Sequence, residues 1–101
     1  EGAKGDAHYI VAKALISQGK LEEAQHMAQM KLRSIQQKGD RNVEGKMLLC
    51  LGEISINKSL STAIQPLTQA LTIFREVQAQ TMVIKALLLL CRAHWIKKNV
   101  H

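Results

Sequence analysis

Small residues recur at a nearly constant interval along the 101-residue chain, and this interval limits the folds that the chain can adopt. Ala12, Gly52 and Cys91 are separated by 40 and 39 residues, and Ala24 and Ala63 are also separated by 39 residues. A small side chain lets two helices approach each other closely. Repetition at intervals of roughly 20 to 50 residues is typical of stacked supersecondary units. The sequence therefore predicts a series of similar helical hairpins.

Apolar residues recur at helical spacing almost throughout the sequence, with four interruptions. Three of the interruptions contain glycine, asparagine or serine, residues that end helices and form turns. They fall near residues 19–20, 38–42, 57–61 and 77–79. The pattern predicts five helices, which cover about 6–18, 21–38, 40 or 42 to 56, 61 or 62 to 76, and 80–97.

Several residues have the chemistry of helix ends. Asp6 is predicted to cap the first helix, and Gly19 is predicted to supply the left-handed residue that ends it. The second helix has Glu22 and Glu23 in its first turn and Lys38 in its last turn, so charges of both signs complement its dipole. The candidate caps of the third and fourth helices are Asp40 or Asn42, and Ser61 or Thr62. The inward positions of these two helices are Met47, Leu48, Leu51, Ile54, Ile56, Ile64, Leu67, Leu71 and Phe74.

The last predicted helix, 80–97, is apolar nearly all round, and such a helix needs cover on several sides. We expect either a longer solenoid or a second copy of the chain to cover it, so self-association through this helix is one expected contact. Trp95 is expected to lie in the core of this helix packing, with a partner-binding role as the alternative. Cys50 and Cys91 are expected to be reduced and buried, because the chain lacks the cysteine density of a disulfide-stapled secreted domain.

The charge of the chain is basic but dispersed. Its 14 Lys and Arg residues exceed its 8 Asp and Glu residues by six, a balance that can serve nucleic-acid or membrane binding. The basic residues are scattered from 4 to 98, however, and the most apolar run, 86–91, is far shorter than the roughly 20 residues of a membrane span. We therefore expect no nucleic-acid and no membrane partner. With no signal peptide visible, we expect an intracellular location, in the nucleus or the cytoplasm.

No residue pattern predicts catalysis, a cofactor or a metal site. Cys91 and His94 lie three residues apart on one helical face, but a stable zinc site needs three or four ligands. Residues 52–59 imitate a phosphate-binding loop, yet Asn57 stands where the second glycine is required. No serine or cysteine lies in a nucleophile motif. The sequence therefore predicts a protein that is not an enzyme and that needs no cofactor.

Three segments resemble tetratricopeptide repeats. Residues 19–24 (GKLEEA) and 63–71 (AIQPLTQAL) resemble the second-helix pattern of that family, and Leu51-Gly52 resembles its first-helix Leu-Gly pair. The interval exceeds the usual length of about 34 residues and matches the longer-helix variants of the family. The resemblance implies an all-α fold, a right-handed α-solenoid of antiparallel helix pairs, and a role in protein binding. Repeat one would span about 6–38, repeat two about 42–76, and the first helix of a third repeat about 80–97.

The order of segments from about 23 to 96 is similar to the tetratricopeptide region of scaffold subunits of the anaphase-promoting complex. Residues 23–26 (EAQH), Leu48-Leu49 followed by Glu53, and residues 62–71 with their internal Pro66 carry this similarity. It implies a structural segment of a ubiquitin ligase that drives the cell cycle, where it would hold other subunits in place. The alternative is a regulatory sensor or adaptor that binds peptides and is unrelated to ubiquitin ligation.

In this architecture the first helix of each repeat lines a concave groove. Lys13, Glu53 and Arg92 each follow one of the small repeat residues by one position, and further polar residues lie five or six positions from those small residues. We expect this mildly basic strip to bind an acidic or extended peptide or a neighbouring subunit, and a solvated helix face is the alternative. The candidate groove residues are Lys13, Ser17, Lys46, Glu53, Asn57, Lys85 and Arg92.

Overall fold

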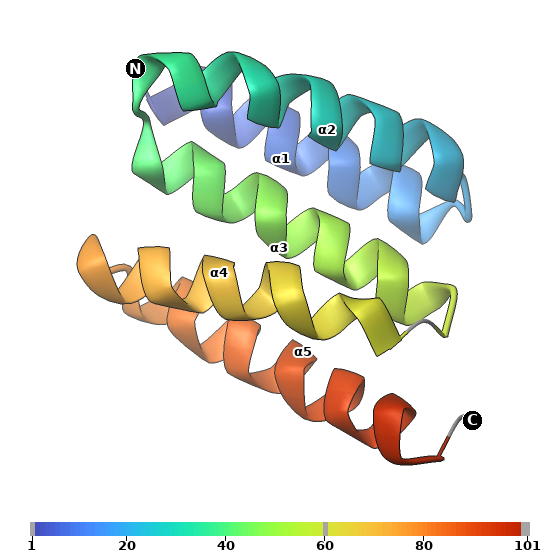
Figure 1. Ribbon diagram of the computed structural model, residues 1–101. Coiled ribbons are helices and arrows are strands. Elements are labelled where there is room, and N and C mark those ends of the chain that lie inside the picture. Colours follow the sequence, from blue (N-terminus) through green and yellow to red (C-terminus); the bar gives the residue numbers. More distant parts are fainter. Residues whose placement is uncertain (1, 60, 100–101) are drawn as a thin grey trace.

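The computed structural model describes residues 2–59 and 61–99, except for the side chains of 2–6, 36–38, 61 and 99. Within these residues the chain forms helices and no strand, which confirms the predicted all-α class (Figure 1). The helices are α1 (Gly2–Ser17), α2 (Leu21–Lys38), α3 (Arg41–Asn57), the short 3-10 helix η1 (Ser61–Ala63), α4 (Ile64–Glu76) and α5 (Gln80–Asn99).

The end of α1 follows the prediction, but its start does not. Helix α1 begins at Gly2, so Asp6 lies inside the helix and the predicted cap was wrong. At the other end Gly19 has φ 79°, its N–H donates to the Ile16 carbonyl, and the Lys20 N–H donates to the Leu15 carbonyl at 2.9 Å. These two bonds satisfy carbonyls that the helix itself leaves unpaired, in the arrangement of a Schellman motif.

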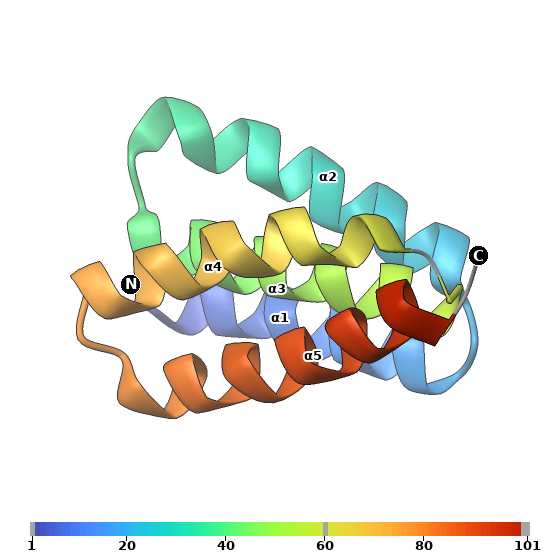
Figure 2. The same ribbon diagram turned by 60° about the horizontal axis from the view of Figure 1, so that its bottom comes forward.

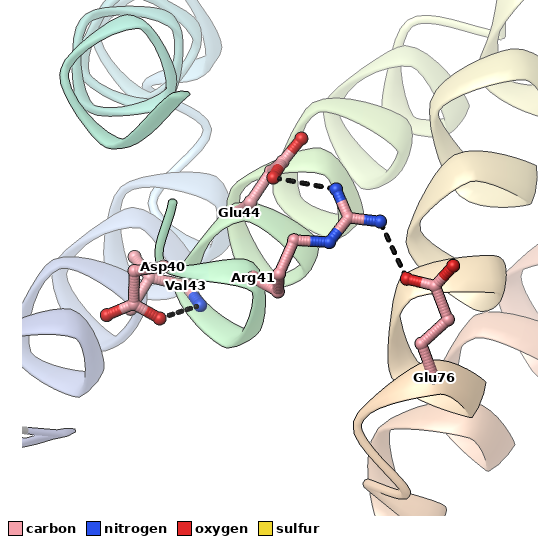
Figure 3. Close-up of polar contacts among 5 residues, drawn as sticks. All are labelled: Asp40, Arg41, Val43, Glu44 and Glu76. Carbon is pink, nitrogen blue, oxygen red and sulfur yellow. Dashed lines mark hydrogen bonds and ion pairs between the residues drawn. The ribbon is translucent and has the colours of Figure 1, made fainter. Parts of the chain in front are cut away.

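Two consecutive residues connect α2 to α3: the first ends α2 and the second caps the start of α3. Gly39, with φ 78°, donates its N–H to the Ile35 carbonyl at 2.8 Å and ends α2. Asp40 then accepts a hydrogen bond from the Val43 N–H at 3.2 Å through its carboxylate (Figure 3). Of the two candidate caps, Asp40 is therefore the one that starts α3.

The start of α4 differs from the prediction. Residues 61–63 form η1, and the residue that precedes α4 is Ala63, with no side-chain cap. The prediction that Ser61 or Thr62 caps α4 was therefore wrong. Pro66 is the third residue of α4, where a backbone N–H has no partner within the helix, so the missing donor costs little.

The five α-helices form two layers, with α1, α3 and α5 in one and α2 and α4 in the other (Figures 1 and 2). Helix α3 packs directly against α1 and α5, whereas the backbones of α2 and α4 lie further apart. The smallest extent of the molecule is 21 Å, about twice the diameter of a helix. The first helices of successive pairs are thus neighbours and share one face of the molecule.

Helix α3 is the centre of the packing because it contributes to two clusters of buried residues. One side of α3 packs with α1 and α2 through Val43, Met47 and Ile54. The other side packs with α4 and α5 through Leu48 and Leu49. This double burial explains why α3 is apolar on almost its whole circumference.

Two glycines of α3 receive large side chains of α4. A methyl group at Gly52 would overlap the Leu67 side chain, and a methyl group at Gly45 would lie 2.7 Å from the Phe74 ring. The glycines are seven residues apart, as are Leu67 and Phe74, and the order of the two pairs is reversed because α3 and α4 run antiparallel. Glycine at these positions lets the two helix backbones approach closely.

The two faces of α5 correct two predictions. Its inward face consists of Met82, Ala86, Leu90, Ala93 and Ile96, all of which are buried. Cys91 and Trp95 point away from this face and are exposed, so neither lies in the core as predicted. Among the repeated small residues, Ala12 and Gly52 are buried, whereas Cys91 is not.

Ion pairs join helices that are distant in the sequence, and three of them lie among the described residues. Arg41, at the start of α3, contacts Glu44 at 3.1 Å and Glu76, at the end of α4, at 2.7 Å (Figure 3). Lys58 contacts Glu22 at 2.8 Å and so joins the end of α3 to the start of α2. The third pair, between α1 and α3, lies in the candidate site.

No helix in the described part of the chain is long and apolar enough to cross a lipid bilayer.

Candidate functional site

The shared face of α1, α3 and α5 contains a hollow of about 390 Å³. We call it the α1–α3–α5 groove. Each of the three helices contributes side chains to it, and both charged and apolar groups are present. The lining residues are Tyr9, Lys13, Leu49, Glu53, Lys85, Leu88, Leu89 and Arg92.

Most of the lining residues occupy equivalent positions of the three helices. Lys13, Glu53 and Arg92 follow Ala12, Gly52 and Cys91 by one residue. A second set precedes the same small residues by three positions, so each of its members lies one helical turn from a member of the first set. The members of the second set are Tyr9, Leu49 and Leu88.

A salt bridge joins α1 and α3 within the groove. Lys13 Nζ lies 2.7 Å from Glu53 Oε1, and the Glu53 side chain is only 15% exposed. Because Glu53 is the only carboxylate that lines the groove in the described part of the chain, this pair neutralises it. The negative charge of the groove is therefore already taken up by the protein itself.

The amino groups of two lysines lie over the ring of Tyr9. Lys46 Nζ and Lys85 Nζ lie 5.9 Å and 5.7 Å from the ring centroid, within the range of a cation–π contact. The Tyr9 hydroxyl is buried and has no hydrogen-bond partner among the described residues. Burial, with the nearby Cys50 and Glu53, raises the pKa of Tyr9 to about 12, so the phenol keeps its proton at neutral pH.

The remaining cations make the groove electropositive. Lys85 and Arg92 have no ion-pair partner among the described residues, and both line the groove. The groove thus combines unpaired positive charge with the apolar side chains of Leu49, Leu88 and Leu89. This combination suits a ligand that has carboxylates and intervening apolar groups.

The structure brings together five of the seven candidate residues. Lys13, Glu53, Lys85 and Arg92 line the groove, and Lys46 lies over Tyr9 at its margin. The other two, Ser17 and Asn57, are the exposed last residues of α1 and α3 and do not line it. The Asn57 side chain instead donates to the Glu53 carbonyl of its own helix at 2.9 Å.

Sequence reasoning missed Tyr9 and the three leucines of the groove. The signal was present, because Tyr9, Leu49 and Leu88 share one repeat position, but apolar residues at helical spacing also indicate core. The predicted groove residues were the polar ones at fixed offsets from the small repeat residues. The polar half of the groove was therefore found and the apolar half was not.

Two further features bear on the chemistry of the described residues. Within them, no group of three or more His, Cys, Asp and Glu side chains is placed to hold a metal ion. Cys91 and His94 are both exposed, so the thiol is not packed as expected. Burial raises the pKa of the Cys50 thiol to about 12, which leaves it protonated and a poor nucleophile.

Comparison of the chain with models of known protein families, with curated proteins and with solved structures gives no match. The geometry and charge of the α1–α3–α5 groove are therefore what bears on function.

Proposed function

We propose that the chain is part of a non-catalytic protein-interaction scaffold, and that its α1–α3–α5 groove binds an extended, acidic segment of a partner protein. The observation that carries the proposal is that α1, α3 and α5, which lie in one layer, line the groove with residues from equivalent positions. Such a row of positions offers the same kind of contact at regular steps, which suits a polypeptide better than a compact small molecule.

The charges of the groove favour an acidic partner. Glu53 is already paired with Lys13 at 2.7 Å, whereas Lys85 and Arg92 have no carboxylate partner among the described residues. An incoming Asp or Glu would bind these two cations without displacing an existing salt bridge. Leu88, which lies one turn from Arg92, would contact an apolar side chain of the same segment.

Tyr9 adds a polar group to the floor of the groove. Its hydroxyl has no hydrogen-bond partner among the described residues, and a buried unpaired donor is costly. A carbonyl or carboxylate oxygen of the partner would accept from it once the side chains that cover the hydroxyl move aside. The raised pKa of Tyr9, about 12, keeps this donor available at neutral pH.

In its sharper form the proposal includes the overall architecture and the assembly. The two layers and the α1, α3, α5 row support a right-handed α-solenoid of the tetratricopeptide kind. The similarity of segment order, carried by Leu48, Leu49, Glu53 and residues 62–71, supports a structural segment like that of subunit 5 of the anaphase-promoting complex. In that setting the groove would hold a neighbouring subunit.

The groove is tested with a synthetic peptide of about ten residues in which Asp and Glu alternate with leucine. We compare the wild type with the triple variant Lys13→Ala, Lys46→Ala, Arg92→Ala by fluorescence anisotropy. Removal of three partly exposed charges is expected to raise Kd about tenfold. The affinity of the wild type should also fall as salt is added.

A matched control removes the same charge elsewhere. Lys20→Ala, Lys31→Ala and Arg33→Ala lie at the start and in the body of α2, outside the groove. This variant should bind the peptide with a Kd within about twofold of the wild type. If both triple variants lose affinity equally, net charge and not the groove binds the peptide, and the proposal fails.

The assembly is tested separately in cells. The protein that contains this chain is tagged at one end, purified gently and analysed by mass spectrometry. Near-equal recovery of the subunits of the anaphase-promoting complex supports the sharper form. Recovery of a different stable complex discards that assembly and leaves the groove to be judged by the peptide experiment. A partner that binds only transiently would favour the alternative of a regulatory adaptor.

A further inference from the structure

Helix α5 has an outward apolar face that no described element covers. Ile84, Leu88 and Trp95 are 59%, 62% and 64% exposed, and Leu87 is 42% exposed. With the exposed Cys91, these residues form what we call the α5 stripe. Figures 1 and 2 both place α5 at one end of the helix stack, packed against its neighbours on one side only.

The spacing of the α5 stripe is that of a helix-packing surface. Its residues follow Ile84 by three, four, seven and eleven positions, which at about 100° per residue confines them to roughly a third of the helix circumference. Ala86 and Ala93, the centre of the buried face, lie on the opposite side of α5. The stripe therefore points directly away from the core.

Basic residues lie beside the α5 stripe. Lys85 and Arg92 border it on the groove side, and Lys98 lies within its arc near the end of α5. Helix α5 contains no Asp and no Glu.

Hollows along the edges of the stripe add to this charge. One is the α1–α3–α5 groove, which contains Leu88 of the stripe. Another, of about 680 Å³, lies between α4 and α5 and contains Ile84 and Arg75. A smaller one, of about 270 Å³, contains Trp95 and Arg92. Among the described residues that line them, Glu53 is the only carboxylate, and it is paired with Lys13.

We propose that the α5 stripe docks an amphipathic helix of another protein whose apolar side is flanked by Asp and Glu. The apolar spacing of the stripe fits the i, i+3, i+4, i+7 anchors of such a helix. The flanking cations select its charge, because like charges across an interface cost free energy and opposite charges guide binding. A second copy of this chain would instead oppose Lys85, Arg92 and Lys98 with its own basic residues.

The docking surface adjoins the groove and shares Lys85, Leu88 and Arg92 with it, but it extends beyond the groove. Ile84, Leu87 and Trp95 belong to the stripe and do not line the groove. A substitution at these positions therefore tests the stripe, and a substitution at Lys13 tests the groove.

The probe is a synthetic peptide of about 18 residues, or five helical turns, with leucines on one face and Glu on both flanks. It contains no Trp and no Cys. Trp95 is the single tryptophan of the chain, so its emission should move to shorter wavelength when the helix covers it. The peptide should also slow the alkylation of Cys91, by about tenfold at a concentration ten times its Kd.

Two matched peptides separate the sources of affinity. In one, every Glu becomes Lys, and in the other every leucine becomes Ser. Both should bind at least about tenfold more weakly than the acidic helix. Equal binding of the Glu and Lys peptides would overturn the assignment of an acidic partner.

Two matched protein variants locate the site. Ile84→Ser with Leu87→Ser removes two exposed stripe residues and should raise Kd about tenfold. Val11→Ser with Met30→Ser removes exposed apolar residues of α1 and α2, and should leave Kd within about twofold. Circular dichroism and urea midpoints establish that each variant is folded.

Three other outcomes would overturn the proposal. The wild type alone could sediment as a dimer with Cys91 protected, which would show that a second copy covers the stripe. The acidic helix could lose affinity with Lys13→Ala but not with the stripe variant, which would assign it to the groove. It could also leave both Trp95 emission and Cys91 alkylation unchanged, which would show that the stripe binds no such helix.

Discussion

The Leu67 side chain of α4 occupies the space that a side chain at Gly52 of α3 would need. Gly52 is one of the small residues that recur at the repeat interval, so here the repeat has a direct steric cause. Two turns away, Phe74 lies over Gly45 in the same manner. The close approach of α3 and α4 thus depends on two glycines and the two large side chains that they admit.

Gly52→Ala should destabilise the protein by about 1–3 kcal/mol, because overpacking outweighs the gain of about 1 kcal/mol in helix propensity. The free energy of unfolding is measured by urea titration. In a Leu67→Ala background, itself destabilised by about 2–5 kcal/mol, the same substitution should become neutral or stabilising. An equal effect in both backgrounds would show that Leu67 is not the cause.

Asp40→Ala should lower the free energy of unfolding by about 1 kcal/mol, because the Val43 N–H would lose its acceptor at the start of α3. Asp40→Asn and Asp40→Ser keep an acceptor and should cost only a few tenths of a kcal/mol, roughly. Thermal and urea unfolding of the three variants provide the comparison. If Asn and Ser cost as much as Ala, the side chain does not act as a cap.

The salt bridge between Lys13 and Glu53 should contribute a coupling free energy of about 0.5–1 kcal/mol. A double-mutant cycle of Lys13→Ala and Glu53→Ala measures it. The coupling should shrink in about 1 M NaCl, because salt screens charges that are partly exposed. The pair of Lys58 with the highly exposed Glu22 is the control and should couple less.

Stability should fall at high pH because the folded protein holds protons on Tyr9 and Cys50 more tightly than the unfolded chain does. Burial raises the pKa of Tyr9 from 10.0 to about 12 and that of Cys50 from 9.0 to about 12. Both groups therefore favour the native state below pH 9, and this contribution is lost as the pH rises through 12.

The titration of Tyr9 can be followed alone, because it is the single tyrosine of the chain. Its tyrosinate absorbance should rise with a midpoint near 12 in the folded protein and near 10 in concentrated urea. Circular dichroism identifies the pH range in which the protein stays folded. A midpoint near 10 in that range contradicts the burial of the hydroxyl.

The two cysteines should differ in accessibility. Cys91 is exposed and Cys50 is fully buried, so iodoacetamide should modify one residue per folded chain and two per unfolded chain. Peptide mapping by mass spectrometry identifies the modified residue. Comparable rates at both residues in the folded protein would show that α3 opens on the time scale of the reaction.

Local chemistry made most helix ends predictable from sequence. Gly19 ends α1 through its positive φ, and Asp40 caps α3 through its carboxylate. Both effects act over a few residues and leave a clear mark in the sequence. The caps at Asp6 and at Ser61 or Thr62 failed because α1 extends further back and because η1 precedes α4.

Exposure on α5 was not predictable from its pattern. An apolar residue at helical spacing predicts burial, but which faces are covered depends on how many neighbours the helix has. Helix α3 has neighbours on both sides and buries Met47 and Leu49, whereas α5 has them on one side and exposes Leu88 and Trp95. The same limit explains why only the charged residues of the groove were predicted. A charged residue indicates an exposed surface, whereas the sequence does not show whether Tyr9 or a leucine is exposed.

The sharing of α3 between two cores determines how the molecule should come apart. Met47 and Ile54 hold the hairpin of α1 and α2, and Leu49 holds that of α4 and α5. If either hairpin unfolds, the buried residues on one side of α3 become exposed. This coupling between neighbouring helices should make unfolding cooperative across the predicted repeat boundaries. A ligand in the groove would contact α1, α3 and α5 at once. It would therefore stabilise both hairpins and raise the melting temperature of the whole chain.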